Sequence, residues 1–154
     1  MKLRSKEKIK IRSLKEAKEF LKNFTEDIKK FLIKKKKLII LFKGDLGYGK
    51  TTFIKEIAKN LGVKEILKSP SFVIWQVYNF KLNKENYILN HIDLYRINAK
   101  DLLKLSFKKK VKEKNNLFLI EWGEKLEKYL RSYIIFEIKK DGKIREVSIK
   151  WKNL

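Results

Sequence analysis

The spacing of apolar positions changes along the chain, and each change marks a predicted element. Residues 7–13, EKIKIRS, alternate apolar and polar side chains, which predicts a short strand. From residue 14 the apolar residues recur every three or four positions, which predicts an amphipathic helix. Ser13 and Glu16 form a capping box at its start. The apolar stripe of this helix consists of Leu14, Ala17, Phe20, Leu21, Phe24, Ile28, Phe31 and Leu32.

A continuous apolar run, Leu38–Phe42, follows this helix and is typical of a buried parallel strand. A second helix is predicted from about Lys50, with Gly62 at its end. Its apolar face contains Phe53, Ile54, Ile57, Ala58 and Leu61. A strand, a glycine-rich loop and a helix therefore follow one another in this part of the chain.

The remaining pattern predicts further strands and one more helix. Two strands are expected at Phe72–Phe80 and Tyr87–Ile92, around a polar turn. A helix over about residues 99–110 precedes the strand Leu117–Trp122. Residues 133–151 read as an antiparallel hairpin with Asp141-Gly142 at its turn. The pattern predicts one α/β domain over residues 1–154, with a mixed sheet flanked by helices.

Composition restricts the class of protein. Apolar residues make up 44% of the 154 positions, which indicates a globular chain. Cysteine is missing, which excludes disulfides and thiolate metal sites. The basic amino terminus has no apolar segment behind it, and no apolar run approaches the length of a membrane span. A soluble cytoplasmic protein is expected.

The net charge of +22 raises the question of a nucleic-acid partner. Only five of the 40 basic residues are arginine, whereas direct readers of phosphate and guanine favour its bidentate guanidinium. The joint abundance of lysine, isoleucine and asparagine fits codon drift in an AT-rich genome. We favour solvated lysine faces, which still allow weak, salt-sensitive contact with nucleic acid.

The segment Leu41–Phe53, LFKGDLGYGKTTF, contains the complete pattern Gly-x-x-x-x-Gly-Lys-Thr. Glycines allow successive backbone N–H groups to converge on phosphate oxygens, and the following helix adds the partial positive charge of its amino terminus. Lys50 is placed to reach the β- and γ-phosphates, and the Thr51 hydroxyl to bind magnesium. The segment therefore predicts a nucleoside triphosphate site.

Hydrolysis also requires acids near the metal. The strand LFLIE carries Glu121 to the carboxyl edge of the sheet, where ligands bind in such folds. Asp93, in HIDLYR, ends another predicted strand. His91 is the only histidine and is more typical of a packing residue than of a base. Arg96 fits either neutralisation of γ-phosphate charge or a structural salt bridge.

Several P-loop classes are disfavoured. A small GTPase needs Asn-Lys-x-Asp, and the nearest string, NKEN at residues 83–86, lacks the aspartate. A nucleotide kinase needs a group of arginines to hold its second substrate, and motor or helicase ATPases need a larger core. A minimal ATPase remains.

Four motifs in order then identify a resemblance. GDLGYGKTTF, SPSF (Ser69–Phe72), HIDLYR (His91–Arg96) and IEWGEKL (Ile120–Leu126) resemble the TsaE family, the bacterial ATPases of tRNA threonylcarbamoyladenosine biosynthesis. The resemblance extends from about Ser13 to Arg145. It implies a magnesium-dependent ATPase, slow alone and stimulated by the TsaB and TsaD subunits, with tRNA contacted indirectly or weakly.

The resemblance also implies roles for particular residues. Thr51 and Glu121 correspond to the magnesium site, and Asp93, Glu121 and Lys50 to the residues needed for hydrolysis. The ATP-binding positions correspond to Ser13, Gly47, Tyr48, Gly49, Lys50, Thr51, Thr52, Glu124 and Arg145.

The chain departs from the family pattern at several places. Tyr48 replaces the usual alanine, Ser71 a threonine and Gly123 a proline, which we expect to loosen the turn before Glu124. The segment between Arg96 and Leu117 is short and lacks the acidic-glycine pattern of the family. The ATP-site motifs therefore match the family more completely than the segment that is expected to face a partner.

Two other functions remain open. One is a nucleic-acid-binding ATPase, in which exposed aromatic rings would stack on bases. The candidate rings are Trp75, Tyr78, Phe80 and Tyr87. Packing between strands explains the same residues more simply. A nucleotide-binding scaffold without hydrolysis is the third hypothesis.

Overall fold

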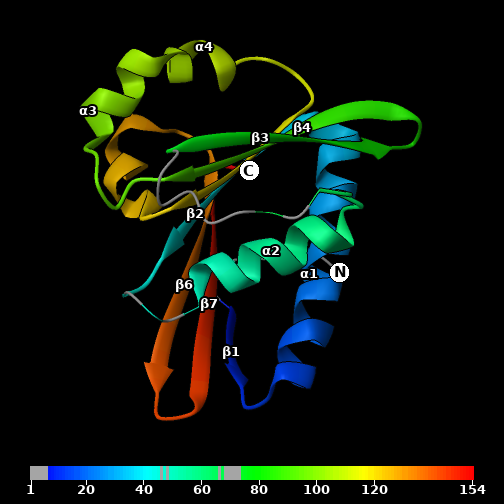
Figure 1. The fold of residues 1–154 in the computed structure, drawn as a ribbon, viewed down its shortest axis with the longest axis vertical. Helices are drawn as coiled ribbons and strands as arrows, with labels where there is room; N and C mark the ends of the chain where they lie inside the picture. Colours follow the sequence, from blue (N-terminus) through cyan, green and yellow to red (C-terminus); the bar gives the residue numbers. More distant parts are fainter. Residues whose placement is uncertain (1–6, 46, 48, 66, 68–73) are drawn as a thin grey trace.

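One mixed sheet contains the seven strands of the described chain, in the spatial order β1-β7-β6-β2-β5-β4-β3 (Figure 1). The computed structural model describes residues 7–45, 47, 49–65, 67 and 74–154. The strands are β1 (Glu7–Ile11), β2 (Lys37–Lys43), β3 (Trp75–Leu82), β4 (Glu85–Asp93), β5 (Asn116–Glu121), β6 (Tyr133–Asp141) and β7 (Ile144–Lys152). The helical elements are α1 (Leu14–Lys35), α2 (Lys50–Asn60), α3 (Ala99–Leu102), η1 (Leu103–Phe107), α4 (Lys108–Lys110) and η2 (Gly123–Tyr129).

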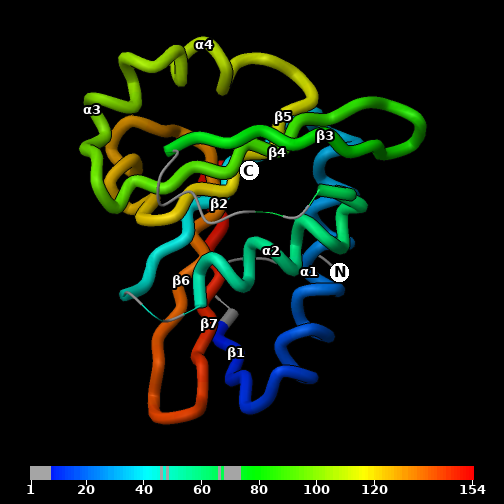
Figure 2. The backbone as a smooth tube through the Cα atoms, in the orientation of Figure 1, coloured from blue at the N-terminus to red at the C-terminus, as the bar shows by residue number. Residues whose placement is uncertain are grey.

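The central strands run parallel. β2 pairs in parallel with β5 and β6, and β5 pairs in parallel with β4. The outer pairs β3–β4, β6–β7 and β1–β7 are antiparallel. Phe42 of β2 lies opposite Glu121 of β5, and Glu121 lies opposite Asp93 of β4. The carboxyl ends of β2, β4 and β5 therefore meet at one edge of the sheet, next to the amino terminus of α2 (Figure 2).

Helical elements cover both faces of the sheet. The apolar stripes of α1 and α2 pack with Ile40, Phe42 and Leu119 in one core cluster. On the opposite face Leu41 and Phe118 pack with residues of α3, η1 and η2 in a second cluster. Residues of β2 thus alternate between two cores, as expected for a strand buried on both sides. The predicted α/β fold is confirmed.

The ends of the two long helices follow the predicted local chemistry. Ser13 Oγ accepts a hydrogen bond from Glu16 N at 3.1 Å, and Glu16 Oε2 accepts one from Arg12 N at 2.7 Å, so the box at α1 is confirmed. At the end of α2, Val63 N donates to Ala58 O at 3.1 Å. This bond closes the helix at the predicted glycine turn.

The predicted helix at residues 99–110 is broken. Leu105 leaves helical geometry, and Ser106 has a φ of 68°. Leu102 and Phe107 are both fully buried. Residues five apart in a regular α-helix point about 140° away from each other. The wider turn of η1 brings both side chains to the core, so tertiary packing overrides the local pattern.

Several strand boundaries also differ from the predictions, most of them by one or two residues. The strand predicted from Phe72 begins at Trp75 and extends to Leu82, and residues 72 and 73 lie outside the described part. β5 ends at Glu121 because Trp122 turns the chain with a φ of 58°. In the confirmed C-terminal hairpin, Asp141 belongs to β6 and pairs with Ile144.

The helices of the described chain show no candidate for a membrane span. None combines the length with the apolar character that a crossing requires.

Candidate functional site

The loop between β2 and α2 carries the glycine-rich motif. Gly47 and Gly49 have φ values of 78° and 96°, a region that a side chain disfavours. Gly49 precedes the first turn of α2, and its carbonyl accepts a hydrogen bond from Phe53 N at 2.9 Å. The loop therefore leads directly into a helix amino terminus, the local geometry used for phosphate binding. Tyr48 lies outside the described residues.

The Lys50 side chain is buried at the start of α2, with 5% of its surface exposed. Its Nζ donates to the carbonyl oxygen of Gly44 and, at 3.3 Å, to that of Asp45. The same ammonium group lies 3.8 Å from the centre of the Trp122 ring. The lysine is thus folded back on the loop and on an aromatic face, where a cation is stabilised by the ring quadrupole.

Four carboxylates, those of Glu121, Glu124, Asp93 and Asp45, act on the charge of Lys50, and the first three come from outside its loop. Burial lowers the pKa of Lys50, and the negative charges of Glu121, Glu124 and Asp93 oppose that effect in decreasing order. These acids come from three places in the chain: the end of β5, η2 and the end of β4. The structure therefore brings together the lysine and the predicted acids.

The Glu121 carboxylate is the centre of the site. It is buried, and its Oε1 accepts a hydrogen bond from the Thr51 hydroxyl at 2.6 Å. Its Oε2 lies 2.8 Å from Nε2 of His91. The hydroxyl and the carboxylate predicted for the metal are in direct contact, although they stand 70 positions apart in the sequence.

Asp93 and Glu124 are partly buried acids on either side of Glu121. Burial raises the pKa of Asp93, while the hydrogen bond that its Oδ1 accepts from Tyr95 N at 2.9 Å lowers it. Burial likewise raises the pKa of Glu124. Among the described residues, Oε1 of Glu124 is buried and finds no hydrogen-bond partner. An orphaned buried oxygen beside a lysine is suited to a bound ligand with its water or metal.

The oxygen donors fit magnesium. A hydroxyl and a carboxylate are hard ligands, and magnesium bound with a nucleotide keeps waters and phosphate oxygens as its other ligands. Within the described residues, no group of three or more His, Asp and Glu side chains forms a complete metal cage. The pair Thr51 and Glu121 therefore matches a metal that is shared with a phosphate ligand.

The remaining predicted residues lie farther from Lys50. Thr52 follows Thr51 in α2, and its side chain is exposed. Arg145 lies on β7 opposite Ile11, next to the chain that leads to Ser13. β7 is separated from β2 by β6. Arg145 pairs with Lys140, three positions past Glu137, which pairs with the last residue of β2, so Arg145 lies beyond the carboxyl end of the loop strand.

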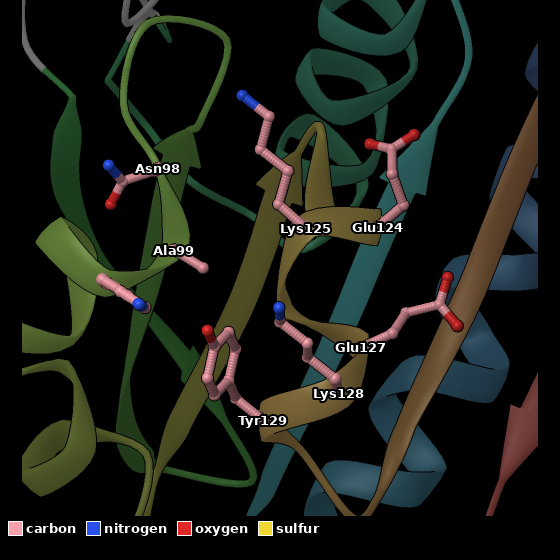
Figure 3. A pocket seen from close by; sticks show the side chains of 8 residues that line it. Asn98, Ala99, Glu124, Lys125, Glu127, Lys128 and Tyr129 are labelled. Carbon is pink, nitrogen blue, oxygen red and sulfur yellow. The ribbon is translucent and has the colours of Figure 1, made fainter.

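A cavity of about 650 Å³ lies between η2 and the start of α3. Figure 3 shows Lys125, Lys128 and Tyr129 on the side of η2 that faces Ala99, while Glu124 points to the other side. Lys125 Nζ donates to the carbonyl of Leu94 at 2.6 Å. This bond links the element that carries Glu124 to the turn that follows Asp93.

Gly123, the replacement for the usual proline of the family, is tightly packed. A Cβ added here would lie 2.6 Å from Cβ of Leu41 and 2.8 Å from its Cα. The start of η2 therefore rests directly on β2. Close contact with β2 fixes the position of Gly123, and the expected loosening of the turn relative to proline stays a prediction.

The aromatic residues considered for base stacking are engaged elsewhere. Tyr78, Phe80 and Tyr87 are buried. Trp75 packs on Phe107, and its Nε1 donates to Asn90 at 3.1 Å. Three of the four rings are therefore buried in the core, and Trp75 is half-buried against Phe107 of η1.

Three residues of the site were not assigned to it by sequence reasoning. His91 had a usable signal, because it lies two positions before Asp93 on a strand and therefore shares its face. No sequence signal indicated the contact of Trp122 with Lys50 or that of Lys125 with Leu94, because both depend on how η2 folds back over the sheet.

The fold and this site define a P-loop protein, with an α/β sheet and a phosphate-binding loop before α2. A search of known families matches residues 12–147 to the family described as "Threonylcarbamoyl adenosine biosynthesis protein TsaE". The chain belongs to the TsaE family, whose members are P-loop ATPase-like proteins.

Named relatives agree with this assignment, and one solved structure shares the fold. A protein named "tRNA threonylcarbamoyladenosine biosynthesis protein TsaE" from Rickettsia typhi is 35% identical over 127 residues, which cover 81% of this chain and 80% of the relative. A protein of the same name from Treponema pallidum is 30% identical over 72% of this chain and 80% of its own length. The crystal structure of Bacillus subtilis YdiB shares the fold, with a TM-score of 0.71 and 24% identity over 99% of this chain and 90% of that one.

Proposed function

We propose that this protein binds and hydrolyses ATP to support threonylcarbamoyladenosine formation on tRNA, in the cytoplasm and together with TsaB and TsaD. The observation that carries the proposal is the convergence of Lys50, Thr51 and Glu121 at the phosphate loop. Membership of the TsaE family supports the pathway, and the relatives' names place those proteins in the same tRNA modification.

The loop residues hold the phosphates of ATP. Backbone N–H groups around Gly47 and Gly49 and the amino terminus of α2 receive the negative charge. Lys50 exchanges the carbonyls of Gly44 and Asp45 for β- and γ-phosphate oxygens. This exchange requires only a side-chain rotation, because the lysine already lies at the mouth of the loop.

Thr51 and Glu121 hold magnesium beside the phosphates. Magnesium, when bound, neutralises the charge that develops on the β- and γ-phosphates. Asp93 ends the neighbouring strand and orients the attacking water or senses the metal. Glu124 and Thr52 contact the nucleotide near the loop, as does Tyr48, whereas Ser13 and Arg145 contact it from the β7 side.

Partner contact is supported by exposed apolar side chains on the elements around η2. Tyr95, Leu105 and Tyr129 are 47%, 50% and 37% exposed. We propose that no arginine in the described part of the chain acts as an arginine finger. The protein alone should therefore hydrolyse ATP slowly, and TsaB–TsaD should stimulate the hydrolysis.

The decisive experiment compares wild type with Glu121→Ala. ATP affinity is measured by calorimetry, and hydrolysis is measured with magnesium, with and without TsaB–TsaD. We expect hydrolysis to fall on the order of 10²- to 10⁴-fold, with much less change in ATP affinity, because the loop still holds the phosphates. The exposed residue Glu19, changed to Ala, controls for the loss of one negative charge.

A proportional fall in binding and hydrolysis would contradict the metal role of Glu121. Wild type that binds ATP but never hydrolyses it, even with TsaB–TsaD, would favour a scaffold.

Asp93→Ala provides a second experiment: we expect this variant to bind ATP, and repeated rounds of tRNA modification to stop. Normal repeated modification by this variant would remove Asp93 from the mechanism.

A further inference from the structure

His91, the only histidine of the chain, lies behind the metal side of the proposed ATP site. Its side chain is fully buried, and its Nε2 lies 2.8 Å from Oε2 of Glu121. On β4 it faces Leu119 of β5, while Asp93 faces Glu121. Residues two apart on a strand share a face, so His91, Asp93 and Glu121 lie on the side of the sheet that α2 covers.

Both oxygens of the Glu121 carboxylate have fixed partners. Oε1 accepts from the Thr51 hydroxyl, and Oε2 contacts His91. An ionised carboxylate only accepts hydrogen bonds, so in the contact with ionised Glu121 the donor is Nε2 of His91. The two contacts determine the rotation of the carboxylate, which directs Oε1 toward Thr51.

The surroundings of the imidazole favour this role over simple packing. Two of its neighbours, Leu89 on the same strand and Leu119 on β5, are fully buried apolar residues, and the half-buried Gln76 lies opposite it on β3. Among the described residues, the ring's other nitrogen, Nδ1, has no hydrogen-bond partner. A polar ring costs free energy at such a position unless it is bonded, and an apolar residue would pack without that cost. The bond to Glu121 is the compensation that the described structure provides.

We propose that His91 is a positioning residue for magnesium, which holds Glu121 in the orientation that faces Thr51. The inference rests on the proposed ATPase function and adds a residue to it. Partners that hold a metal-binding carboxylate typically contribute 10- to 100-fold to metal affinity or activity.

A matched pair of variants tests the role. His91→Phe keeps a planar ring and removes the donor, whereas the amide nitrogen of His91→Gln stands at the same number of bonds from the backbone as Nε2. In His91→Phe we expect the magnesium concentration for half-maximal hydrolysis to rise about 10- to 100-fold. ATP affinity without magnesium should stay within about twofold, and the Gln variant should recover most of the loss.

Nuclear magnetic resonance of the single imidazole provides a readout that needs neither ATP nor metal. We expect one ring N–H, at Nε2, that exchanges slowly with water and shifts in Glu121→Ala. An unprotonated Nε2, or a ring proton that exchanges as in a free histidine, would overturn the proposal.

The outcomes separate the two hypotheses. Unchanged magnesium dependence in His91→Phe, or equal losses in the Phe and Gln variants, would overturn the role of His91. If His91→Phe does not fold, two other measurements test the role: the magnesium dependence of His91→Gln and the exchange of the wild-type ring N–H. The role is supported if His91→Gln has the magnesium dependence of the wild type and Nε2–H exchanges slowly. Any other result overturns it. Wild type that binds no ATP would instead contradict the proposed function, while the imidazole spectrum still reports the contact with Glu121.

Discussion

Lys50 is held by partners that a phosphate can replace. Its ammonium group lies among backbone carbonyls, the Trp122 ring and three acids, and most of the side chain is buried. Such an arrangement keeps the cation close to the loop, and among the described residues no direct ion pair of Lys50 would have to break before a ligand binds. We therefore expect ATP affinity to depend strongly on this side chain.

Lys50→Ala should reduce ATP affinity by about 10- to 100-fold, because a charged hydrogen-bond donor to phosphate is lost. Calorimetric titration with ATP measures the change, and circular dichroism checks the fold. Lys55→Ala, an exposed lysine on the same helix, is the matched control and should bind as wild type does. Near-wild-type affinity in Lys50→Ala would contradict the phosphate role.

Glu124 predicts a pH dependence of stability. Burial raises its pKa above the ordinary value of 4.5, so the folded state retains the proton more strongly than the unfolded state. The ionised form is then unfavourable in the folded protein at neutral pH. Glu124→Gln should increase the free energy of unfolding at pH 7, and the gain should shrink as the pH falls and vanish below about 4.5.

Urea unfolding of the nucleotide-free protein at several pH values measures this difference. Glu19→Gln removes one exposed negative charge and serves as the control. A constant difference between wild type and Glu124→Gln at all pH values would contradict the burial of this acid.

At the scale of elements, the first turn of α1 has two assigned functions. Ser13 caps the helix in the structure, and family resemblance assigns it to the nucleotide. Ser13→Ala should lower the free energy of unfolding by about 1 kcal/mol, because one amide of the first turn loses its partner. Ser13→Asp restores a capping oxygen and should recover most of the stability.

ATP affinity of the two Ser13 variants separates capping from binding. A loss in both variants would assign the serine hydroxyl to the nucleotide. Wild-type affinity in both would leave Ser13 with the cap alone.

At the scale of the whole molecule, we propose that residues 1–154 form one domain with a weakly RNA-binding surface. Every described strand joins the same sheet, and the net charge is +22. Because the aromatic rings considered for stacking are buried or half-buried, the lysines are left to make non-specific contacts with phosphate.

Affinity for tRNA should therefore fall at least about tenfold between 50 and 200 mM salt, with no preference over another RNA of equal length. RNA alone should not stimulate ATP hydrolysis. Fluorescence anisotropy and an ATPase assay test both points. Stimulation of hydrolysis by RNA without TsaB–TsaD would instead favour the nucleic-acid-dependent ATPase.

Several local features of the structure could be predicted from short segments of the sequence. The capping box at Ser13, the run Leu38–Phe42 and the glycine motif depend on neighbours within a few positions, and the structure keeps them where the pattern placed them. The order of the strands is different: β2 lies between β5 and β6, and only packing on both faces of the sheet selects that arrangement.

The sequence alone determined the glycine-rich loop, the two long helices and the presence of the strands that bring Asp93 and Glu121 to the carboxyl end of the sheet. Each of these is a property of a short segment, set by side-chain periodicity and by the few residues that bound it. Only the tertiary structure decided that His91 contacts Glu121, that Trp122 covers Lys50 and that the helix at 99–110 breaks at Ser106. These features join segments distant in the chain or depend on burial against them, and the free energy of such contacts exists only once the sheet has assembled.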